Sequence, residues 1–339
     1  AVPTLCGVNS YNIGRPLVQM IHFVWTYLQV MQYQQQSQSQ SMIPPLGDPD
    51  YTIDIILPTG AMGNIVGGYM AKLMGTPIGK LCAGVNINDI THRVFTKGQF
   101  HKSDRMEKTL SDAINIQVPY NFERLLFYLS NQDHDLVKSY MIQMEQTQKV
   151  NIIHNLLTKM QRDFGSARIT DDDMCHTLRC VHQKYGYYIC PHTAVAFATA
   201  ERLGYGVLKS IKPSCARSKD DELSLLERKR RENNNFNDNV KDNEEDNIMP
   251  TTNHQRPFAI LATASPCKFQ ESMTVAMGTE GWDDYYQHAF PKRAKDVMEA
   301  AMECTPTFYP WKEECSLEEN QLIWTDIARA IVKDFECVG

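Results

Sequence analysis

The chain runs Tyr51-Thr52-Ile53-Asp54-Ile55-Ile56-Leu57-Pro58-Thr59-Gly60-Ala61-Met62-Gly63-Asn64 where an apolar segment meets a turn with two glycines. Residues 51–57 predict a strand, 58–63 a turn, and 64–74 a helix that ends at Gly75. Residues 80–85 predict a second strand, and Asn88-Asp89 should cap a helix that continues to about residue 96. Strand, helix, strand and helix at this spacing predict a βαβ unit, and therefore an α/β fold with a parallel pair of strands.

Further regular elements are predicted outward from this unit. Apolar spacing predicts helices over 15–34, most of 121–182, the residues after Pro191, 269–277, 292–302 and 317–332. Residues 258–263 predict a short buried strand. The Gln/Ser-rich run 34–41 is expected to be a mobile loop. Residues 218–247 are expected to be disordered, because so polar a composition buries too little surface to offset the entropy of ordering.

Composition excludes several classes of function. The net charge of -6 over 339 residues makes nucleic acid an unexpected partner. No apolar run is long enough to predict a membrane span, and the opening Ala1-Val2-Pro3-Thr4-Leu5 has no signal-peptide pattern. The basic cluster Arg228-Lys229-Arg230-Arg231 is interpreted as a solvated loop, with a nuclear signal as the alternative.

Cysteine and histidine usage predicts no metal site. The ten cysteines include no C-x-x-C pair, and Cys175 and Cys180 lie five apart, which is not zinc-ligand spacing. The ten histidines form no H-E-x-x-H motif. A chain of this length does not need a disulfide framework, so we expect reduced thiols and a cytoplasmic, reducing compartment.

The turn after the first predicted strand is the strongest local indication of a ligand. Two glycines let the backbone approach an anion, and the following helix begins with unpaired N–H groups at the positive end of its dipole. Pro58–Gly63 is neither a Walker loop nor a G-x-G-x-x-G motif. A phosphate cradle and a plain tight turn both remain open from these residues alone.

Three other segments carry candidate site residues. In the segment 261–269, Thr263 could present its hydroxyl at the carboxyl end of a strand. Ser265 is favoured as a helix N-cap, and Lys268 is disfavoured as a Schiff-base lysine because no apolar pocket is evident around it. His192, after Pro191 at a helix start, is either an acid/base group or, as we favour, a structural histidine. Residues 8–12 predict a capped helix entry.

Taken in this order, the segments resemble the threonine synthase family of fold-type-II pyridoxal phosphate (PLP) enzymes. The motifs that carry the resemblance are Asn9-Ser10-Tyr11-Asn12, Pro58 to Asn64, Asn86 to Arg93, Asn121-Phe122-Glu123-Arg124, Pro191 to Val195 and Thr263 to Phe269. The amino-acid sequences of the glycine turn and of residues 116–121 most resemble those of the animal threonine synthase-like 2 branch. The implied fold is tryptophan synthase β-like, an open, mostly parallel sheet flanked by helices.

The resemblance implies roles for particular residues. The backbone of Gly60, Ala61, Met62, Gly63 and Asn64 would cradle the phosphate of pyridoxal 5'-phosphate. The hydroxyl of Thr263 would hydrogen-bond the pyridine nitrogen and, being neutral, would leave that nitrogen largely unprotonated. This environment suits elimination and replacement chemistry, with the cofactor as electron sink.

The sequence also departs from the family pattern. The family's lysine motif and its substrate-gripping segment lie upstream of the Asn9 motif, and Tyr11 and Cys190 differ from the usual residues. With no initiator Met at Ala1, we expect a fragment or processed product. No catalytic residue is therefore identified in this chain. We expect 1–217 to be the main, incomplete part of a PLP-binding domain with a helical region at about 121–185, 218–250 a disordered polar insert, and 251–339 the remainder.

The resemblance implies that the full-length parent is a carbon–oxygen lyase of amino-acid metabolism. It would eliminate phosphate from O-phosphohomoserine or O-phosphothreonine to give 2-oxobutyrate, or threonine if water is added. The expected partner is a small phosphorylated amino acid, and a homodimer is the assembly considered. Two alternatives stay open. A lysine-less form could be a non-catalytic binding or secreted signalling protein, or residues 60–64 could bind a nucleotide instead of PLP.

Overall fold

The computed structural model describes residues 9, 11–37, 51–208, 256–303, 316 and 319. The chain divides into two compact units, Ala1–Ala289 and Phe290–Gly339. In the second unit the structure describes helix α11, Lys292–Glu303, which confirms the helix predicted over 292–302. The predicted polar insert at 218–250 lies outside the described residues, as do nearly all of 317–332 and residues 38–41 of the Gln/Ser run.

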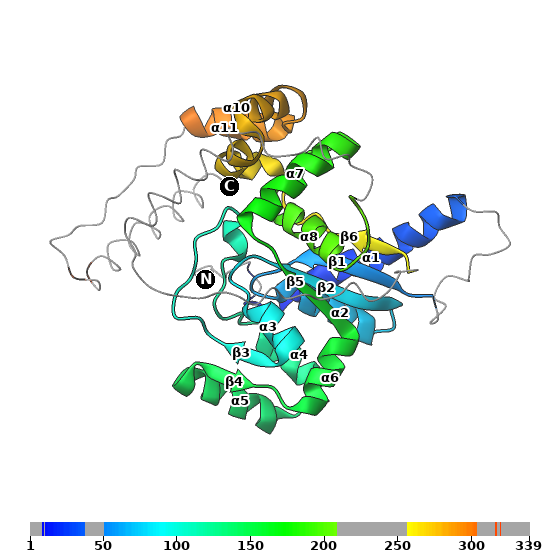
Figure 1. Ribbon diagram of the computed structural model, residues 1–339, viewed down its shortest axis with the longest axis vertical. Helices are drawn as coiled ribbons and strands as arrows, with labels where there is room; N and C mark the ends of the chain where they lie inside the picture. The colour runs from blue at the N-terminus through cyan, green and yellow to red at the C-terminus, as the bar shows by residue number, and fades with distance from the viewer. Residues whose placement is uncertain are drawn as a thin grey trace, which may run out of the picture. The chain divides into compact units, whose positions relative to one another are not determined.

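The first unit is built on a four-stranded sheet in the order β5-β2-β1-β6 (Figure 1). Every pair of neighbours in this sheet is parallel. The strands are β1 Ile53–Pro58, β2 Ile78–Val85, β5 Phe164–Arg168 and β6 Phe258–Ile260. The α/β class and the parallel β1–β2 pair predicted from the sequence are confirmed.

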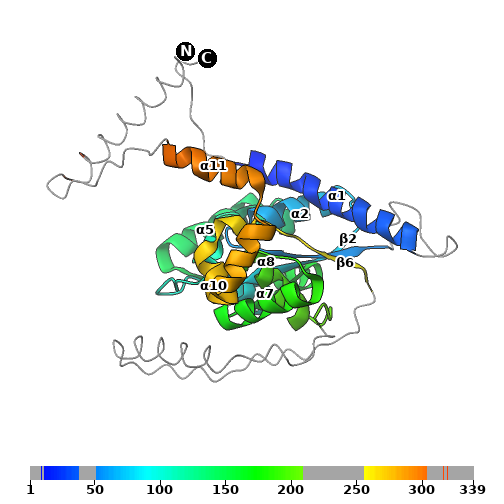
Figure 2. The same cartoon turned by 90° about the horizontal axis from the view of Figure 1, so that it is seen from above.

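Strand β1 lies at the centre because its residues are apolar on both faces. Ile55 and Leu57 pack in the main core with α1, Gly14–Ser37, and α2, Gly63–Leu73. Ile56 points to the other face, where it packs against Ala196 and Ala200 of helix α8. Figure 2 shows α1 and α2 on one side of the sheet and α7 and α8 on the other. Such two-sided burial is typical of parallel sheets.

The other helices of this unit surround the sheet and the loops at its carboxyl ends. They are α3 Ile90–Lys97, α4 Phe122–Leu129, α5 His134–Thr147, α6 His154–Asp163, α7 Asp171–Tyr185, α8 Pro191–Arg202 and α10 Gln270–His288. Two short 3₁₀ turns, η1 Asp112–Ile114 and η3 Pro266–Lys268, matter for the site below.

Helical segments dominate residues 121–185, as predicted, although β5 and β4, Lys149–Asn151, lie between them. Strand β4 pairs antiparallel with β3, Gln99–His101. Two expectations need correction. Helix α1 continues through Gln34 to Ser37, so the Gln/Ser run begins as helix. Strand β6 ends at residue 260 instead of 263, and its residues are only half-buried. Short strands with few apolar residues gain most of their stability from their neighbours, which explains why the sequence pattern missed them.

Helix α1 packs closely on α2 because a glycine faces it. A Cβ atom built on Gly68 would lie 2.5 Å from the Phe23 ring, which is buried in the core. Any larger side chain at position 68 would therefore push α1 away. Since α1 also lines the cavity described next, this contact helps to position the site.

Among the helices of the described residues, none combines the length and apolar character needed to cross a membrane.

Candidate cofactor and substrate site

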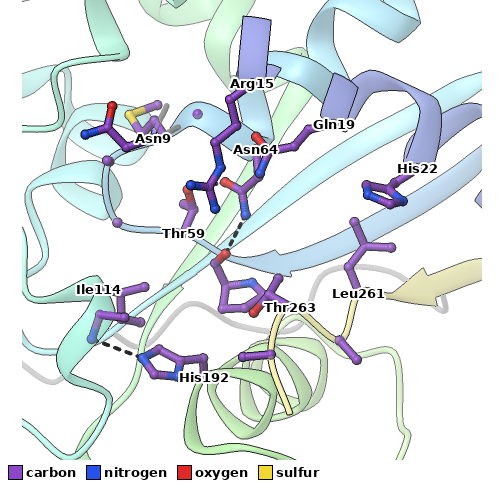
Figure 3. A pocket seen from close by; sticks show the side chains of 18 of the residues that line it. Asn9, Arg15, Gln19, His22, Thr59, Asn64, Ile114, His192, Leu261 and Thr263 are labelled. Atoms are coloured by element: carbon purple, nitrogen blue, oxygen red, sulfur yellow. Dashed lines mark hydrogen bonds between the residues drawn. The ribbon is translucent and has the colours of Figure 1, made fainter. Parts of the chain in front are cut away.

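A cavity of about 520 Å³ lies where the carboxyl ends of β1 and β6 meet the start of α1. Most of the segments singled out from the sequence contribute to it (Figure 3). Its lining includes residues 58–64 of the glycine turn, 261–264 and Phe269 after β6, His192 of α8, and Asn9, Arg15, Gln19 and His22 at and within α1. The structure therefore brings together four regions that are far apart in the chain.

The glycine turn presents a row of free donors at the cavity. None of the backbone hydrogen bonds found in the described part of the chain uses the N–H of residues 60–64 as donor. These groups lie at the positive end of the α2 dipole, where an anion is favoured. Met62, which precedes α2, has a left-handed φ of 63° although it is not glycine. Such a conformation persists only where the surroundings impose it, and it often marks a functional turn.

Side chains close the turn at both ends. Asn64 Nδ2 donates to the Pro58 carbonyl at 2.9 Å, and Asn64 Oδ1 accepts from Thr59 Oγ1 at 2.7 Å. Asn121 is fully buried and donates from Nδ2 to the Ala61 carbonyl at 2.8 Å. These hydrogen bonds join side-chain groups to one another and to backbone carbonyls. They do not use the backbone N–H groups of the turn, which stay available to a ligand.

A second loop supports the turn from behind. A Cβ atom on Gly60 would lie 2.8 Å from Ile114 Cα and 2.9 Å from Ile116 Cγ1. Glycine is therefore required at position 60 by this close approach. Asn86, after β2, is buried and donates to Thr109 Oγ1 at 2.9 Å and to Asn115 Oδ1 at 2.7 Å. The Asn86 motif thus acts on the turn indirectly, by ordering the loop that contacts Gly60.

The segment after β6 places Thr263 in the cavity lining, as expected. Ser265 occupies the N-cap position of η3, but its side chain makes no capping hydrogen bond, and Pro266 begins a 3₁₀ turn instead of an α-helix. Lys268 is exposed, whereas its neighbour Phe269 lines the cavity. Within the described residues no lysine lines this cavity.

His192 joins α8 to the supporting loop. Its Nε2 accepts the Ala113 N–H at 3.1 Å, and Phe269 packs against its ring at 4.8 Å. The residue is 3% exposed, and burial lowers the pKa of its imidazole, an effect that Asp112 partly opposes. A neutral, buried imidazole is compatible with both interpretations of His192, as a structural residue and as an acid/base group. Cys190 caps the same helix, since its Sγ accepts the Thr193 N–H at 3.4 Å.

Helix α1 supplies cavity residues that the sequence interpretation did not single out. Arg15, Gln19 and His22 point toward the cavity from successive turns of α1 (Figure 3). Their spacing of three to four residues, which puts side chains on one helix face, was the signal that could have identified them. The predicted helix entry is also seen, because Asn12 Oδ1 accepts the Gly14 N–H at 2.9 Å.

This arrangement can hold a phosphate ester with a ring attached. The free N–H groups of the turn suit the phosphate, the hydroxyl of Thr263 suits one polar ring atom, and the guanidinium of Arg15 adds a positive charge to the same cavity. A cavity with a few convergent polar groups on an apolar framework is typical of small-molecule sites.

Comparison with known proteins finds relatives of this chain. No family model matches the chain. Threonine synthase-like 2 from Pongo abelii is 37% identical over 193 residues, which are 57% of this chain and 37% of that protein. Threonine synthase from Saccharomyces cerevisiae is 30% identical over 210 residues, covering 58% of this chain and 38% of that protein. The chain thus spans less than two fifths of the length of these relatives.

A solved structure with bound PLP shares the fold. The threonine synthase of Brucella melitensis superposes with a TM-score of 0.61 at 26% identity, covering 87% of this chain and 48% of that one. The parallel sheet and its flanking helices are those of the fold-type-II class of α/β proteins. Over the matched residues, the chain is similar in sequence to threonine synthase-like 2 and threonine synthase, and it shares the fold of threonine synthase structures.

Proposed function

We propose that this chain is the cofactor-holding part of a PLP-dependent enzyme of the threonine synthase type. The observation that carries the proposal is the row of unpaired N–H groups of residues 60–64 at the start of α2, in a cavity that Thr263 also lines. The relatives supply the context, since the Brucella melitensis threonine synthase holds PLP in its structure.

The residues of the cavity fit this cofactor. The backbone of Gly60, Ala61, Met62, Gly63 and Asn64 would receive the phosphate, and Thr263 Oγ1 would hydrogen-bond the pyridine nitrogen. Because a hydroxyl is uncharged, it does not favour a protonated ring nitrogen as a carboxylate would. When bound, the cofactor supplies an electron sink for negative charge at the α-carbon of an amino acid.

The rest of the cavity fits a small anionic substrate. Arg15 brings a fixed positive charge, and Asn9 and Gln19 add amide groups at the same wall. A guanidinium binds carboxylates and phosphates well because its donors form a planar fork. We propose an O-phosphorylated amino acid such as O-phosphohomoserine or O-phosphothreonine, from which phosphate is eliminated to give 2-oxobutyrate, or threonine when water is added.

The cofactor assignment is tested by binding of pyridoxine 5'-phosphate, which has no aldehyde and so cannot react with surface lysines. Calorimetric titration should show binding of this ester and much weaker binding of pyridoxine, because the phosphate supplies the contacts at residues 60–64. AMP is the competitor that separates PLP from a nucleotide. Equal affinity for AMP, or no binding of the ester, would contradict the proposal.

A non-catalytic binding role remains the second candidate, favoured by the lack of a lysine among the described residues that line the cavity. Borohydride reduction of the chain mixed with PLP, followed by peptide mapping, shows whether PLP forms a covalent bond to one particular lysine of this chain. Diffuse labelling of surface lysines is expected for a chain that depends on a lysine supplied elsewhere. Stoichiometric labelling of one lysine would show that the chain carries its own covalent anchor.

A further inference from the structure

Residues 107–115, which we name the bracing loop, are held by side chains from several elements instead of by a sheet. Apart from the short turn η1, the loop has no regular structure. The residues that hold it from outside are Asn86 after β2, Asp171 of α7, His192 of α8 and Ser272 of α10. The loop position is therefore set by tertiary contacts.

The bracing loop in turn shapes the glycine turn. Ile114 Cα would lie 2.8 Å from a Cβ on Gly60, so the two backbones are already in contact. Ala113, next to Ile114, is the residue whose N–H His192 accepts at 3.1 Å. A movement of the loop at Ala113 therefore changes the support of Gly60, which lines the cavity.

The contact of His192 requires a neutral imidazole. Since Nε2 accepts the Ala113 N–H, the ring proton must be on Nδ1. Nδ1 is buried and has no hydrogen-bond partner within the described part of the chain. A second proton would have to occupy Nε2, where it would face the Ala113 N–H and abolish the bond. A buried donor without a partner lowers stability, which offsets part of what the bond to Ala113 contributes.

We propose that His192 is a positioning residue that holds the bracing loop against Gly60 only in its neutral form, so that protonation of His192 weakens phosphate-ester binding at residues 60–64. The inference rests on the proposed function, because it concerns the same anion site. It goes beyond that function in making the affinity depend on a residue that need not touch the ligand.

Among the described residues, Asp112 is the carboxylate that contacts this imidazole. Asp112 Oδ1 of η1 lies 3.8 Å from Nε2, but its side chain is 69% exposed and so well screened by water. On the other side Phe269 is uncharged, and on α8 itself Cys190 contacts Thr193. Asp171 of α7 also contacts the bracing loop, where its carboxylate accepts the Leu110 N–H at 3.1 Å.

The loop coupling is tested without any ligand. The full chain, labelled with ¹⁵N-glycine and ¹⁵N-alanine, is titrated from about pH 8 to pH 5.5. We expect the amide signals of Ala113 and Gly60 to shift with one common midpoint. The shifts should vanish in His192→Gln, whose amide oxygen accepts a hydrogen bond but cannot be protonated. They should persist in His154→Gln, where an exposed histidine is replaced. Movement of Ala113 without Gly60, or of neither, overturns the proposal.

The effect on affinity is tested with pyridoxine 5'-phosphate over the same pH range. The phosphate itself titrates near pH 6, so the quantity compared is the ratio of affinities of the unaltered chain and His192→Gln at each pH. The ratio should fall about tenfold by one pH unit below the NMR midpoint, because the fraction of the unaltered chain with neutral His192, which can bind the ester, falls by that factor. His192→Met, which has no comparable acceptor, should bind weakly at every pH.

The two possible failures are distinct. A constant ratio, with binding intact, overturns the role of His192 and leaves the proposed function standing. Absence of binding at every pH overturns the proposed function, and the NMR titration still decides whether His192 couples the bracing loop to Gly60.

Discussion

At the scale of single residues, the site depends on a few positions that fix the backbone of the glycine turn. Gly60 contacts the bracing loop directly, Met62 adopts a left-handed conformation, and Asn121 is buried against the Ala61 carbonyl. Each of these features orients backbone N–H groups and not side chains toward the cavity. For this reason the chemistry of the turn depends on backbone geometry more than on residue type.

Gly60→Ala should reduce the affinity for pyridoxine 5'-phosphate by tenfold or more. The new methyl group would meet the backbone of Ile114 at 2.8 Å, and backbone cannot move aside as a flexible side chain can. Calorimetry checks the affinity. Gly186→Ala is the control, because Gly186 lies at the C-cap of α7 with nothing within 4 Å and a φ of 63°. That variant should lose about 1 kcal/mol of stability with unchanged affinity.

His192 should make the stability of the protein depend on pH. Burial lowers the pKa of His192 from its ordinary 6.5, so the unfolded chain binds this proton more readily than the folded one. Stability is therefore lost as the pH falls below 6.5, by at most about 1.4 kcal/mol per pH unit. Urea unfolding at a series of pH values should show a smaller slope for His192→Gln. An identical slope would mean that His192 binds its proton equally readily in the folded and unfolded chains.

At the scale of elements, an ion pair joins the end of α2 to the end of α6. Lys72 Nζ lies 3.0 Å from Asp163 Oδ1, and Arg162 contacts the other carboxylate oxygen at 2.8 Å. Burial by itself would raise the pKa of Asp163, but the hydrogen bonds from Arg162 and Lys72 outweigh it and lower the pKa below its usual value. Lys72 also donates to the Gly79 carbonyl of β2, so this carboxylate stabilises the packing of two helices at one strand.

Asp163→Asn should lower the free energy of unfolding by about 1–3 kcal/mol at neutral pH, because Lys72 loses its buried partner. Since the pKa of Asp163 is lowered on folding, its stabilising effect is present above the unfolded value of 3.8 and is lost as the pH falls through the folded value. Urea unfolding measures the difference. Glu145→Gln, an exposed carboxyl of α5, should change stability little, and an equal loss there would contradict the account.

The prediction of elements succeeded where the pattern was local. The apolar run of β1, the glycine turn and the periodic α2 were predicted within one or two residues. Strand β5 was missed, because Phe164-Gly165-Ser166-Ala167-Arg168 has no apolar alternation. It forms a strand because the β2 edge offers it parallel hydrogen-bonding partners from Leu81 to Val85.

At the scale of the first unit, strand β1 joins two apolar clusters. Ile55 belongs to the large cluster with α1 and α2, and Ile56 to a small cluster with Cys82 and α8. Since neighbouring residues of one strand serve both clusters, loss of packing on either face destabilises the sheet that carries the cavity.

Ile56→Ala should destabilise the protein by about 2–5 kcal/mol, and Ile56→Val by about 0.5–1.5 kcal/mol, because Ile56 is fully buried. Urea unfolding followed by circular dichroism and by tryptophan fluorescence gives the values. A loss below 1 kcal/mol for Ile56→Ala would show that the small cluster contributes little to the sheet.

The sequence by itself determined the βαβ unit, the glycine turn and the family resemblance, because these depend on residue types at fixed local spacing. It also identified residues 60–64 and Thr263, which the structure places in the lining of one cavity. Only the tertiary structure decided the support of that cavity, namely the contact of Ile114 with Gly60, the bond from Ala113 to His192 and the approach of Arg15 from α1. Those contacts join residues tens of positions apart, and no local pattern records which distant backbone will approach a glycine.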